Sequence, residues 1–405
     1  MKSSIFLVML LISYSIIASE QDELVFATYN SPPYQYVDSN IIKGTTVSTV
    51  QCIFHKLNQK TTLSFYPLKR ALRELSKNNI DGVFPVHAND KTNRKHSSPI
   101  SIEKWYWLTN FPLEERNALD VLSNKTIAVV NGSPAHEWLL ETNLTIDTLI
   151  TTRAQLLKMF ITGKVDAIII DDNEAYRDLQ FHRKIESLEH YWRFIKFESH
   201  HLIFSDQAMV NNPKLIDKFN EKIPVCNPLS LKLSLNEKQV LKKYLTPYLS
   251  KLYNYLTSAP SITELKEVFT AVELDGIDVQ WQSEAKKREG TLYNFVYKSA
   301  LSQFLINLQN SSSTAITEII AIDSDGYTIG LSKVTTDLYQ GDEAKFLNTY
   351  PGGPGSIYIS DINYDESTQI FQSQVSFSVP KEISSLGVIT FGVNVEKIIK
   401  YHDLN

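Results

Sequence analysis

Residues Tyr66–Pro85 read YPLKRALRELSKNNIDGVFP, a helix followed by an apolar strand, and this stretch indicates the fold class. Its apolar residues Leu68, Ala71 and Leu75 recur at helical spacing. The same order returns at Leu156–Asp172, LLKMFITGKVDAIIIDD. Strands that alternate with helices predict a parallel, doubly wound sheet. The first 250 residues are therefore predicted to form two similar α/β lobes.

The chain changes character near residue 260. Residues 1–259 carry 30 basic against 26 acidic side chains, whereas residues 260–405 carry 10 against 19 and hold 10 of the 14 glycines. A long helix is predicted from about Asp278 to Asn310, followed by strands and a β-turn at Asp323–Gly326. This order predicts an α+β domain with an antiparallel sheet. The net charge of −5 does not favour nucleic-acid binding.

The N-terminus has the pattern of a targeting segment. Lys2 precedes the apolar stretch Ile5–Ala18, and polar sequence begins at Glu20. A basic residue, a short apolar region and small residues at its end are typical of a secretory signal peptide cleaved near Ser19. The alternative is an N-terminal membrane anchor, for which the stretch is short. The pattern predicts a periplasmic protein.

The sequence contains two cysteines and no convincing catalytic or metal motif. In an oxidising compartment Cys52 and Cys226 can form a disulfide, although lone cysteines are also common as small buried side chains. The adjacent His200 and His201 would face opposite sides of a strand, which does not suit a shared metal ion. No phosphate loop or nucleophile motif occurs. We therefore predict no catalytic residue, metal or cofactor.

With these elements placed, the chain resembles two known families. The first 250 residues resemble family 3 extracellular solute-binding proteins, which have the type II periplasmic binding fold. The segments that carry this resemblance are LVFATYNSPPYQYV (Leu24–Val37), KGTTV (Lys43–Val47), Tyr66–Pro85, SSPI (Ser97–Ile100), KTIAVVNGSPA (Lys125–Ala135), Leu156–Asp172 and NNPKLIDKFNEKI (Asn211–Ile223). The C-terminal part resembles PAS-like Cache (PDC-like) sensor domains through AITEIIAIDSDGYTIGLS (Ala315–Ser332), TTDLYQGDEAKF (Thr335–Phe346), INYDESTQIFQSQVSFSV (Ile362–Val379) and GVITFGVNVEKI (Gly387–Ile398).

The resemblances imply a modular chain. The implied segments are a signal peptide at 1–19, a solute-binding domain at 20–250, a linker at 251–277 and a Cache-like domain at 278–405 that opens with the long helix. Within the solute-binding domain, lobe 1 covers about 20–108 and 200–250, and lobe 2 covers about 109–199. The predicted connector begins as early as Thr246 and contains proline, tyrosine and serine.

Candidate ligand contacts follow the ends of the predicted strands, because clefts of α/β proteins lie beyond the carboxyl ends of their strands. This rule selects eight residues: Tyr29, Asn30, Tyr34, Tyr66, His87, Asn89, Ser133 and Asp171. The tyrosines suit a wall around a small ligand, but packing within loops is an equal alternative. Ser133 follows a glycine and precedes a predicted helix, where it either caps the helix or helps to bind an anion.

Two charged candidates depend on the resemblance. In amino-acid-binding relatives, an aspartate at the position of Asp171 accepts the ammonium group of the ligand. Those relatives also place an arginine after the third strand, and Arg94 is the counterpart here, at a shorter spacing to Pro99. A solvated loop is the alternative for both. In the C-terminal part, Asp337, Tyr339 and Asp365 are candidates to border a second pocket.

The sequence thus predicts non-catalytic binding of a small polar solute, such as an amino acid or another zwitterion or anion, in a cleft between two lobes. A membrane transporter or a sensor receptor is the partner that this function implies. Two other functions remain open. One is a regulatory protein that binds a receptor and has a degenerate cleft, and the other is an enzyme similar to periplasmic dehydratases.

Export can be tested directly. Mass spectrometry of the protein purified from the bacterial envelope should find an N-terminus between about residues 19 and 22, because signal peptidase cuts after small residues. Recovery of a chain that begins at Met1 from the membrane fraction would show that the segment is an anchor.

Overall fold

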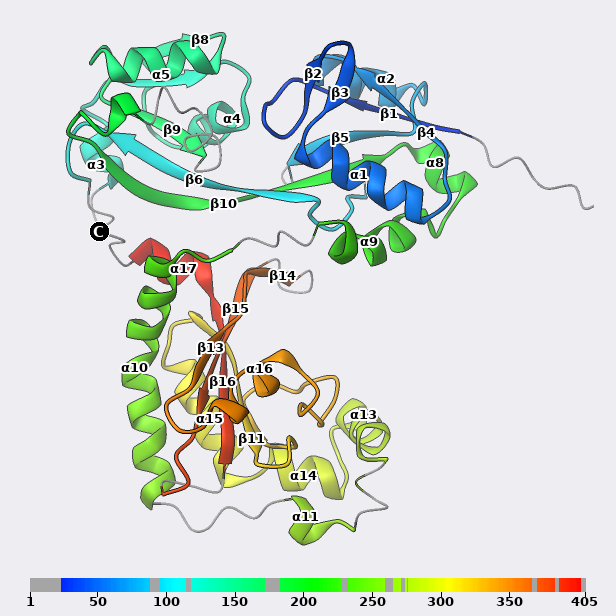
Figure 1. Ribbon diagram of the computed structural model, residues 1–405, viewed down its shortest axis with the longest axis vertical. Coiled ribbons are helices and arrows are strands. Elements are labelled where there is room, and N and C mark those ends of the chain that lie inside the picture. Colours follow the sequence, from blue (N-terminus) through cyan, green and yellow to red (C-terminus); the bar gives the residue numbers. More distant parts are fainter. Residues whose placement is uncertain are drawn as a thin grey trace, which may run out of the picture. The chain divides into compact units, whose positions relative to one another are not determined.

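The computed structural model describes residues 23–87, 95–113, 118–171, 183–227, 232–258, 265–270, 274, 276–365, 370–382 and 386–401 (Figure 1). The chain divides into two compact units, which are treated separately below. The first unit comprises Met1–Pro85, Asn93–Ser97 and Leu202–Cys226. The second comprises Val86–Thr92, Ser98–His201 and Asn227–Asn405. Among the described helices, none combines the length and apolarity that crossing a bilayer requires.

The first unit is an α/β structure built on parallel strands. Its sheet has the order β4-β1-β5-β10, in which β1 lies parallel to both β4 and β5. The strands are β1 (Leu24–Thr28), β4 (Thr61–Phe65), β5 (Gly82–His87) without its last two residues, the end of β10 (Tyr191–Phe204) and the hairpin β2 (Tyr36–Asp38) and β3 (Ile41–Lys43). The helices are α1 (Thr45–Lys56), α2 (Leu68–Ser76), α8 (Asp206–Asn211) and α9 (Leu215–Cys226).

Aromatic side chains and one disulfide hold this unit together. Phe26 of β1 lies 4.6 Å from Phe54 of α1, and Phe54 lies 5.3 Å from Phe219 of α9, measured between ring centroids. Cys52 and Cys226 form a disulfide between the same two helices, with their Cα atoms 5.7 Å apart. The bond closes a loop with a sequence separation of 174 residues. It therefore restricts the unfolded chain strongly.

The second unit begins with a further α/β layer. Its strands have the order β10-β6-β9-β7-β8; β7 is parallel to β8 and β9, whereas β6 is antiparallel to β9 and β10. The elements are β6 (Ser101–Thr109), β7 (Ile127–Val130), β8 (Thr148–Ile150), β9 (Ala167–Asp171), α3 (Ala118–Leu122), α4 (Pro134–Leu140) and α5 (Arg153–Ile161). The expected alternation of strands and helices is confirmed in both units.

The C-terminal half of the second unit is an α+β structure. Its antiparallel sheet has the order β12-β11-β16-β15-β13, and β14 pairs with β15 (Figure 1). The strands are β11 (Ile316–Asp323), β12 (Thr328–Leu331), β13 (Ile357–Ile359), β14 (Asn363–Asp365), β15 (Ile370–Ser378) and β16 (Leu386–Asn394). The helices are α10 (Leu235–Ser258), α11 (Leu265–Val268), α13 (Ile277–Lys287), α14 (Thr291–Tyr297), α15 (Ala300–Asn310), α16 (Ala344–Leu347) and α17 (Val395–Tyr401), with a 3-10 turn at Tyr350–Gly352.

The predicted long helix over 278–310 is wrong, because the structure has three helices there. Arg288 ends α13 in the left-handed conformation, at φ 57°. Gly290 precedes α14 with φ 129°, a backbone conformation that favours glycine. Ser299 starts α15 by accepting a hydrogen bond from the backbone N–H of Ser302. These local stop and start signals override the continuous apolar periodicity.

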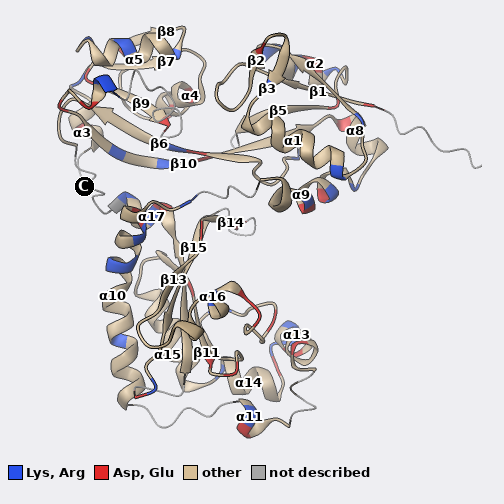
Figure 2. Cartoon of the chain, in the orientation of Figure 1, with Lys and Arg blue, Asp and Glu red and all other residues tan. Residues whose placement is uncertain are grey.

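The predicted connector is also shorter than expected, because α10 continues to Ser258. Pro247 lies inside this helix on its exposed side, where water can satisfy the backbone carbonyl that proline leaves without a donor. Leu241, Leu245 and Leu252 bury the opposite side. Lysines recur on the exposed side (Figure 2). The other predicted domain boundaries remain predictions.

The disulfide gives a stability prediction for the first unit. The double variant Cys52→Ser/Cys226→Ser should lower the free energy of unfolding of this unit by about 2–4 kcal/mol, because its unfolded chain regains entropy. Hydrogen exchange measured by mass spectrometry should show faster exchange in β1 and β4. Peptides from β11 and β16 are the internal control, and an equal loss of protection there would contradict a role confined to the first unit.

Candidate functional site

The predicted tyrosines of the first unit have different environments. Tyr34 is buried, and its backbone carbonyl lies against Gly44, where an added Cβ would come within 2.1 Å of it. Tyr66 is half-buried, and the guanidinium of Arg70 lies 4.4 Å from its ring centroid. Tyr29 follows β1 and is also half-buried. Asn89 and Arg94 lie outside the described residues.

In the second unit, Ser133 and Asp171 both have structural contacts. Ser133 caps α4, because its Oγ accepts a hydrogen bond from the backbone N–H of His136 at 3.2 Å. Asp171 is the last residue of β9 and only 2% exposed. Its Oδ1 accepts a hydrogen bond from the backbone N–H of Lys104 at 3.0 Å. Loss of that carboxylate leaves a buried donor unpaired, which costs about 1–3 kcal/mol of stability.

The C-terminal sheet presents a set of polar side chains on one face. Ser376 pairs with Thr390 across β15 and β16, and their hydroxyl oxygens are 2.9 Å apart. Gln374, two residues before Ser376, reaches across β16 and donates to Glu318 of β11 at 3.5 Å. Gly392 lies between them in the sheet, where an added Cβ would come within 2.5 Å of the Glu318 side chain. The missing side chain therefore gives Glu318 and Gln374 the space to meet.

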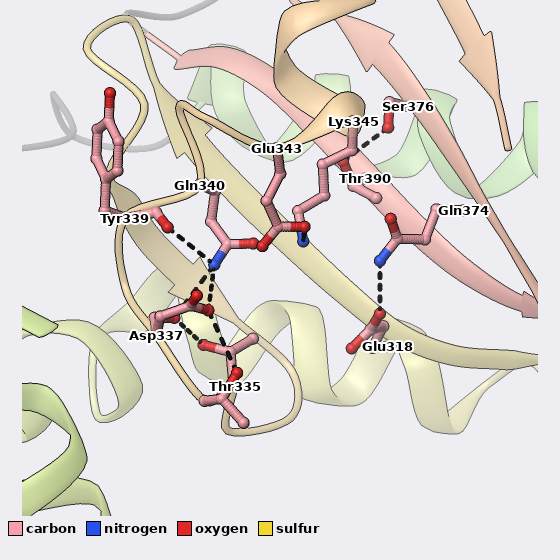
Figure 3. Close-up of polar contacts among 11 residues, drawn as sticks. Glu318, Thr335, Asp337, Tyr339, Gln340, Glu343, Lys345, Gln374, Ser376 and Thr390 are labelled. Carbon is pink, nitrogen blue, oxygen red and sulfur yellow. Dashed lines mark hydrogen bonds and ion pairs between the residues drawn. The ribbon is translucent and has the colours of Figure 1, made fainter. Parts of the chain in front are cut away.

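A loop and the short helix α16 add three more polar side chains. Gln340 is 1% exposed, and its amide nitrogen donates to the backbone carbonyl and the carboxylate of Asp337. Its amide oxygen is buried and has no hydrogen-bond partner among the described residues. The side chain of Lys345 is 5% exposed, and its ammonium lies 3.0 Å from the Glu343 carboxylate. Figure 3 shows the ends of Gln340, Glu343 and Lys345 gathered together.

We call these seven residues the C-terminal polar cluster: Glu318, Gln340, Glu343, Lys345, Gln374, Ser376 and Thr390. It combines one cation, two carboxylates, two amides and two hydroxyls (Figure 3). Buried amides and ammonium groups are nearly always hydrogen-bonded, so an amide oxygen without a partner beside a buried lysine is unusual. The cluster offers an ammonium to an anionic group of a solute, and carboxylates to a cationic one.

The residues expected to border a second pocket lie around this region. Asp337 binds Gln340, as described above, and the rings of Tyr339 and Tyr327 are 5.1 Å apart. Asp365 instead accepts a hydrogen bond from Gln372 at 2.6 Å. Sequence reasoning singled out none of the seven cluster residues, although all of them lie within segments quoted above. Their proximity depends on strand pairing, which no local pattern reveals.

The turn between β11 and β12 does not resemble a metal site. Oδ1 of Asp323 accepts hydrogen bonds from the backbone N–H groups of Asp325 and Tyr327, both at 2.9 Å. This is the bonding of an Asx turn, which agrees with the predicted β-turn. Over the described ranges, no group of three or more histidine, cysteine or acidic residues is arranged to hold a metal ion.

A second polar group of the same unit lies on β6 and β10 and includes His87 at the end of β5. Glu198 of β10 contacts His87 Nδ1 at 2.8 Å and Lys196 Nζ at 2.6 Å. Burial opposes the ionisation of Glu198, but His87 and Lys196 outweigh it and lower its pKa to about 2. His200 lies 3.4 Å from Glu103 and 3.1 Å from Ser101 Oγ. Burial holds the pKa of His200 well below its usual range, so this imidazole is neutral at pH 7.

Comparisons with known proteins add similarity in fold. No family model and no curated protein matches the sequence. A histidine kinase sensor domain similar to periplasmic binding proteins has 16% identity over 51% of this chain and 90% of its own, with a TM-score of 0.41. An ancestral arginine-binding protein bound to arginine has 17% identity over 51% and 93%, with a TM-score of 0.40. The GluR0 ligand-binding core from Nostoc punctiforme in complex with L-glutamate has 19% identity over 51% and 93%, with a TM-score of 0.40. These neighbours are periplasmic-binding-protein-like, and each similarity covers half of the chain.

The neutral state of His200 predicts acid sensitivity. Because its folded pKa lies below the unfolded value of about 6.5, unfolding takes up a proton below that pH. The free energy of unfolding should therefore fall as the pH drops below about 6.5, by at most about 1.4 kcal/mol per pH unit from this group. Urea denaturation at pH 7, 6 and 5 measures this slope.

The variant His200→Gln should flatten the slope, whatever it does to stability at pH 7. His55→Gln, a change of an exposed histidine on α1, is the matched control and should keep the slope of the natural chain. An equally steep slope in the His200 variant would show that other groups cause the acid sensitivity.

Proposed function

We propose that this protein binds a small polar solute in the bacterial periplasm without catalysing a reaction. The C-terminal polar cluster is the observation that carries the proposal. Lys345 is buried beside a single described carboxylate, and the Gln340 amide oxygen beside it has no partner among the described residues. A solute with hydrogen-bond donors and an anionic group satisfies both, which makes binding favourable where burial alone is costly.

The composition of the cluster favours a zwitterion. Lys345 suits a carboxylate of the solute, and Glu318 with Glu343 suits an ammonium group. The hydroxyls of Ser376 and Thr390 and the amide of Gln374 add hydrogen bonds that discriminate by shape. Covalent catalysis requires a nucleophile hydrogen-bonded to a general base, and the described hydrogen bonds of the cluster contain no such pair. We therefore propose an amino acid or a similar zwitterion as the solute class.

The α/β half is the second place where we propose that a solute binds. The residues proposed for it are Tyr29, Tyr34, Tyr66, Asn89, Arg94, Ser133 and Asp171. Binding there would close the two lobes by a hinge motion and present the closed form to a transporter or a sensor receptor. Since Asp171 also holds the backbone of Lys104, its replacement is expected to reduce the stability of the free protein as well as affinity.

A thermal-shift screen against amino acids and organic acids tests the proposal. A true ligand at about 100 times its Kd should stabilise the protein by about 2.7 kcal/mol. The variant Lys345→Met keeps the length of the side chain and removes its charge. It should weaken binding at the cluster by tens- to thousands-fold, because the loss of one buried charge partner costs about 2–5 kcal/mol.

Two control variants separate the alternatives. Lys333→Met changes an exposed lysine of the same half and should leave binding intact. Asp171→Asn should abolish stabilisation by a solute bound in the α/β half and spare one bound at the cluster. If no compound of the panel stabilises the protein, the solute-binding proposal fails, and a receptor-binding protein becomes the better description.

A further inference from the structure

The antiparallel ribbon formed by β6 and β10 contains a β-bulge. The pairing register between the two strands shifts between Phe194 and Lys196 of β10. In a regular strand, side chains three residues apart point to opposite faces. The extra residue changes this alternation, as bulges do. Phe194 and Phe197 consequently join one apolar core, whereas Ile195 joins another that contains Trp107.

The core that receives both phenylalanines is that of the C-terminal half. It includes Leu241 of α10, Leu305 of α15 and Val393 of β16. The ring of Phe197 lies 5.1 Å from that of Phe371 in β15. Two large aromatic side chains of β10 therefore complete a core whose other members come almost entirely from residues after 232.

Hydrogen bonds fix the same contact. The backbone N–H of Phe197 donates to Oε2 of Glu396 in α17 at 3.0 Å. Arg193, which lies just before the bulge, donates through Nη2 to the backbone carbonyl of Lys400 at 2.6 Å. On β6, Lys104 Nζ lies 2.9 Å from both carboxylate oxygens of Glu237 in α10, and both side chains are buried. If the second α/β layer and the C-terminal half separated, these groups would lose the partners named above. The loss of a partner from a buried ion pair costs free energy.

The C-terminal polar cluster lies on strands that lead into this contact. Gln374 and Ser376 belong to β15, as does Phe371, and Thr390 belongs to β16, which continues directly into α17 and Glu396. A change in the position of either strand is therefore transmitted to β10 through packed side chains and not through a flexible linker.

We infer that the bulged β6–β10 ribbon joins the second α/β layer and the C-terminal half into one cooperative body, so that stabilisation of either part stabilises the other. The C-terminal half is then a part of the same folded body and not a separate module attached by a tether. This inference does not rest on the proposed function, because the coupling exists without a ligand and can be measured without one.

Hydrogen exchange of the full-length protein tests the coupling. Phe160→Ala removes a buried ring of α5 from the core of the α/β layer. It should reduce protection in β7 and β9 by roughly a hundredfold or more. If the body is cooperative, protection in β11 and β16 falls by a similar factor, although no atom of those strands has changed. Phe160→Leu is the milder variant should the alanine variant not fold.

The same measurement in a Phe197→Ala background completes the test. There the effect of Phe160→Ala on β11 and β16 should be smaller, because one of the contacts that transmit it is gone. Leu140→Ala truncates an exposed side chain of the same layer and should change no protection. Unchanged protection of β11 and β16 in the Phe160 variant of the otherwise natural chain would overturn the inference. An equal loss in the Phe197→Ala background would show that another contact couples the parts.

Discussion

Burial of the β6–β10 ribbon on both faces is the constraint on which the second unit depends. The ribbon lies within a larger sheet, because β6 also pairs with β9. Here one face packs in the C-terminal core through Phe194 and Phe197, and the other carries Trp105 and Trp107 into the core of the α/β layer. Strict alternation could not send Phe194 and Phe197 to the same side. The bulge between Phe194 and Lys196 resolves this conflict, and both cores are complete only because of it.

The charges of the ribbon follow from the same constraint. Lys104 is buried, so its ammonium requires the carboxylate of Glu237, and removal of either partner would leave an uncompensated charge. On the other face, Glu198 remains ionised because His87 and Lys196 offset the cost of its burial. His200 stays neutral because burial, together with His87 and His201, outweighs the favourable charge of Glu198. Each buried group thus has the protonation state that its nearest neighbours favour.

The sequence predicted the elements better than their pairing. Apolar periodicity and the glycines at turns were sufficient for the alternating strands and helices, since these signals are local. The breaks at Arg288 and Ser299 were missed because the apolar stripe continues across them. The connector was predicted to begin too early because Pro247, which lies inside α10, is a general helix breaker. The polar cluster could not be predicted, because Glu318, Gln374 and Thr390 meet only through the register of three strands.

The proposed binding of a solute at the polar cluster would give this register a functional role. Ser376 and Thr390 pair across β15 and β16, and the opposite sides of the same strands hold Phe377 and Phe391 in the apolar core. A solute that draws Lys345 and Glu343 towards the sheet would act on strands that are buried on the other face and cannot bend freely. Close packing converts such a local change into a shift of whole elements. Because β16 ends in α17 and α17 holds the backbone of Phe197, the first element to respond would be β10 itself. β10, whose residues belong to both units of the chain, is therefore also the strand that packs against the C-terminal half and is hydrogen-bonded to it.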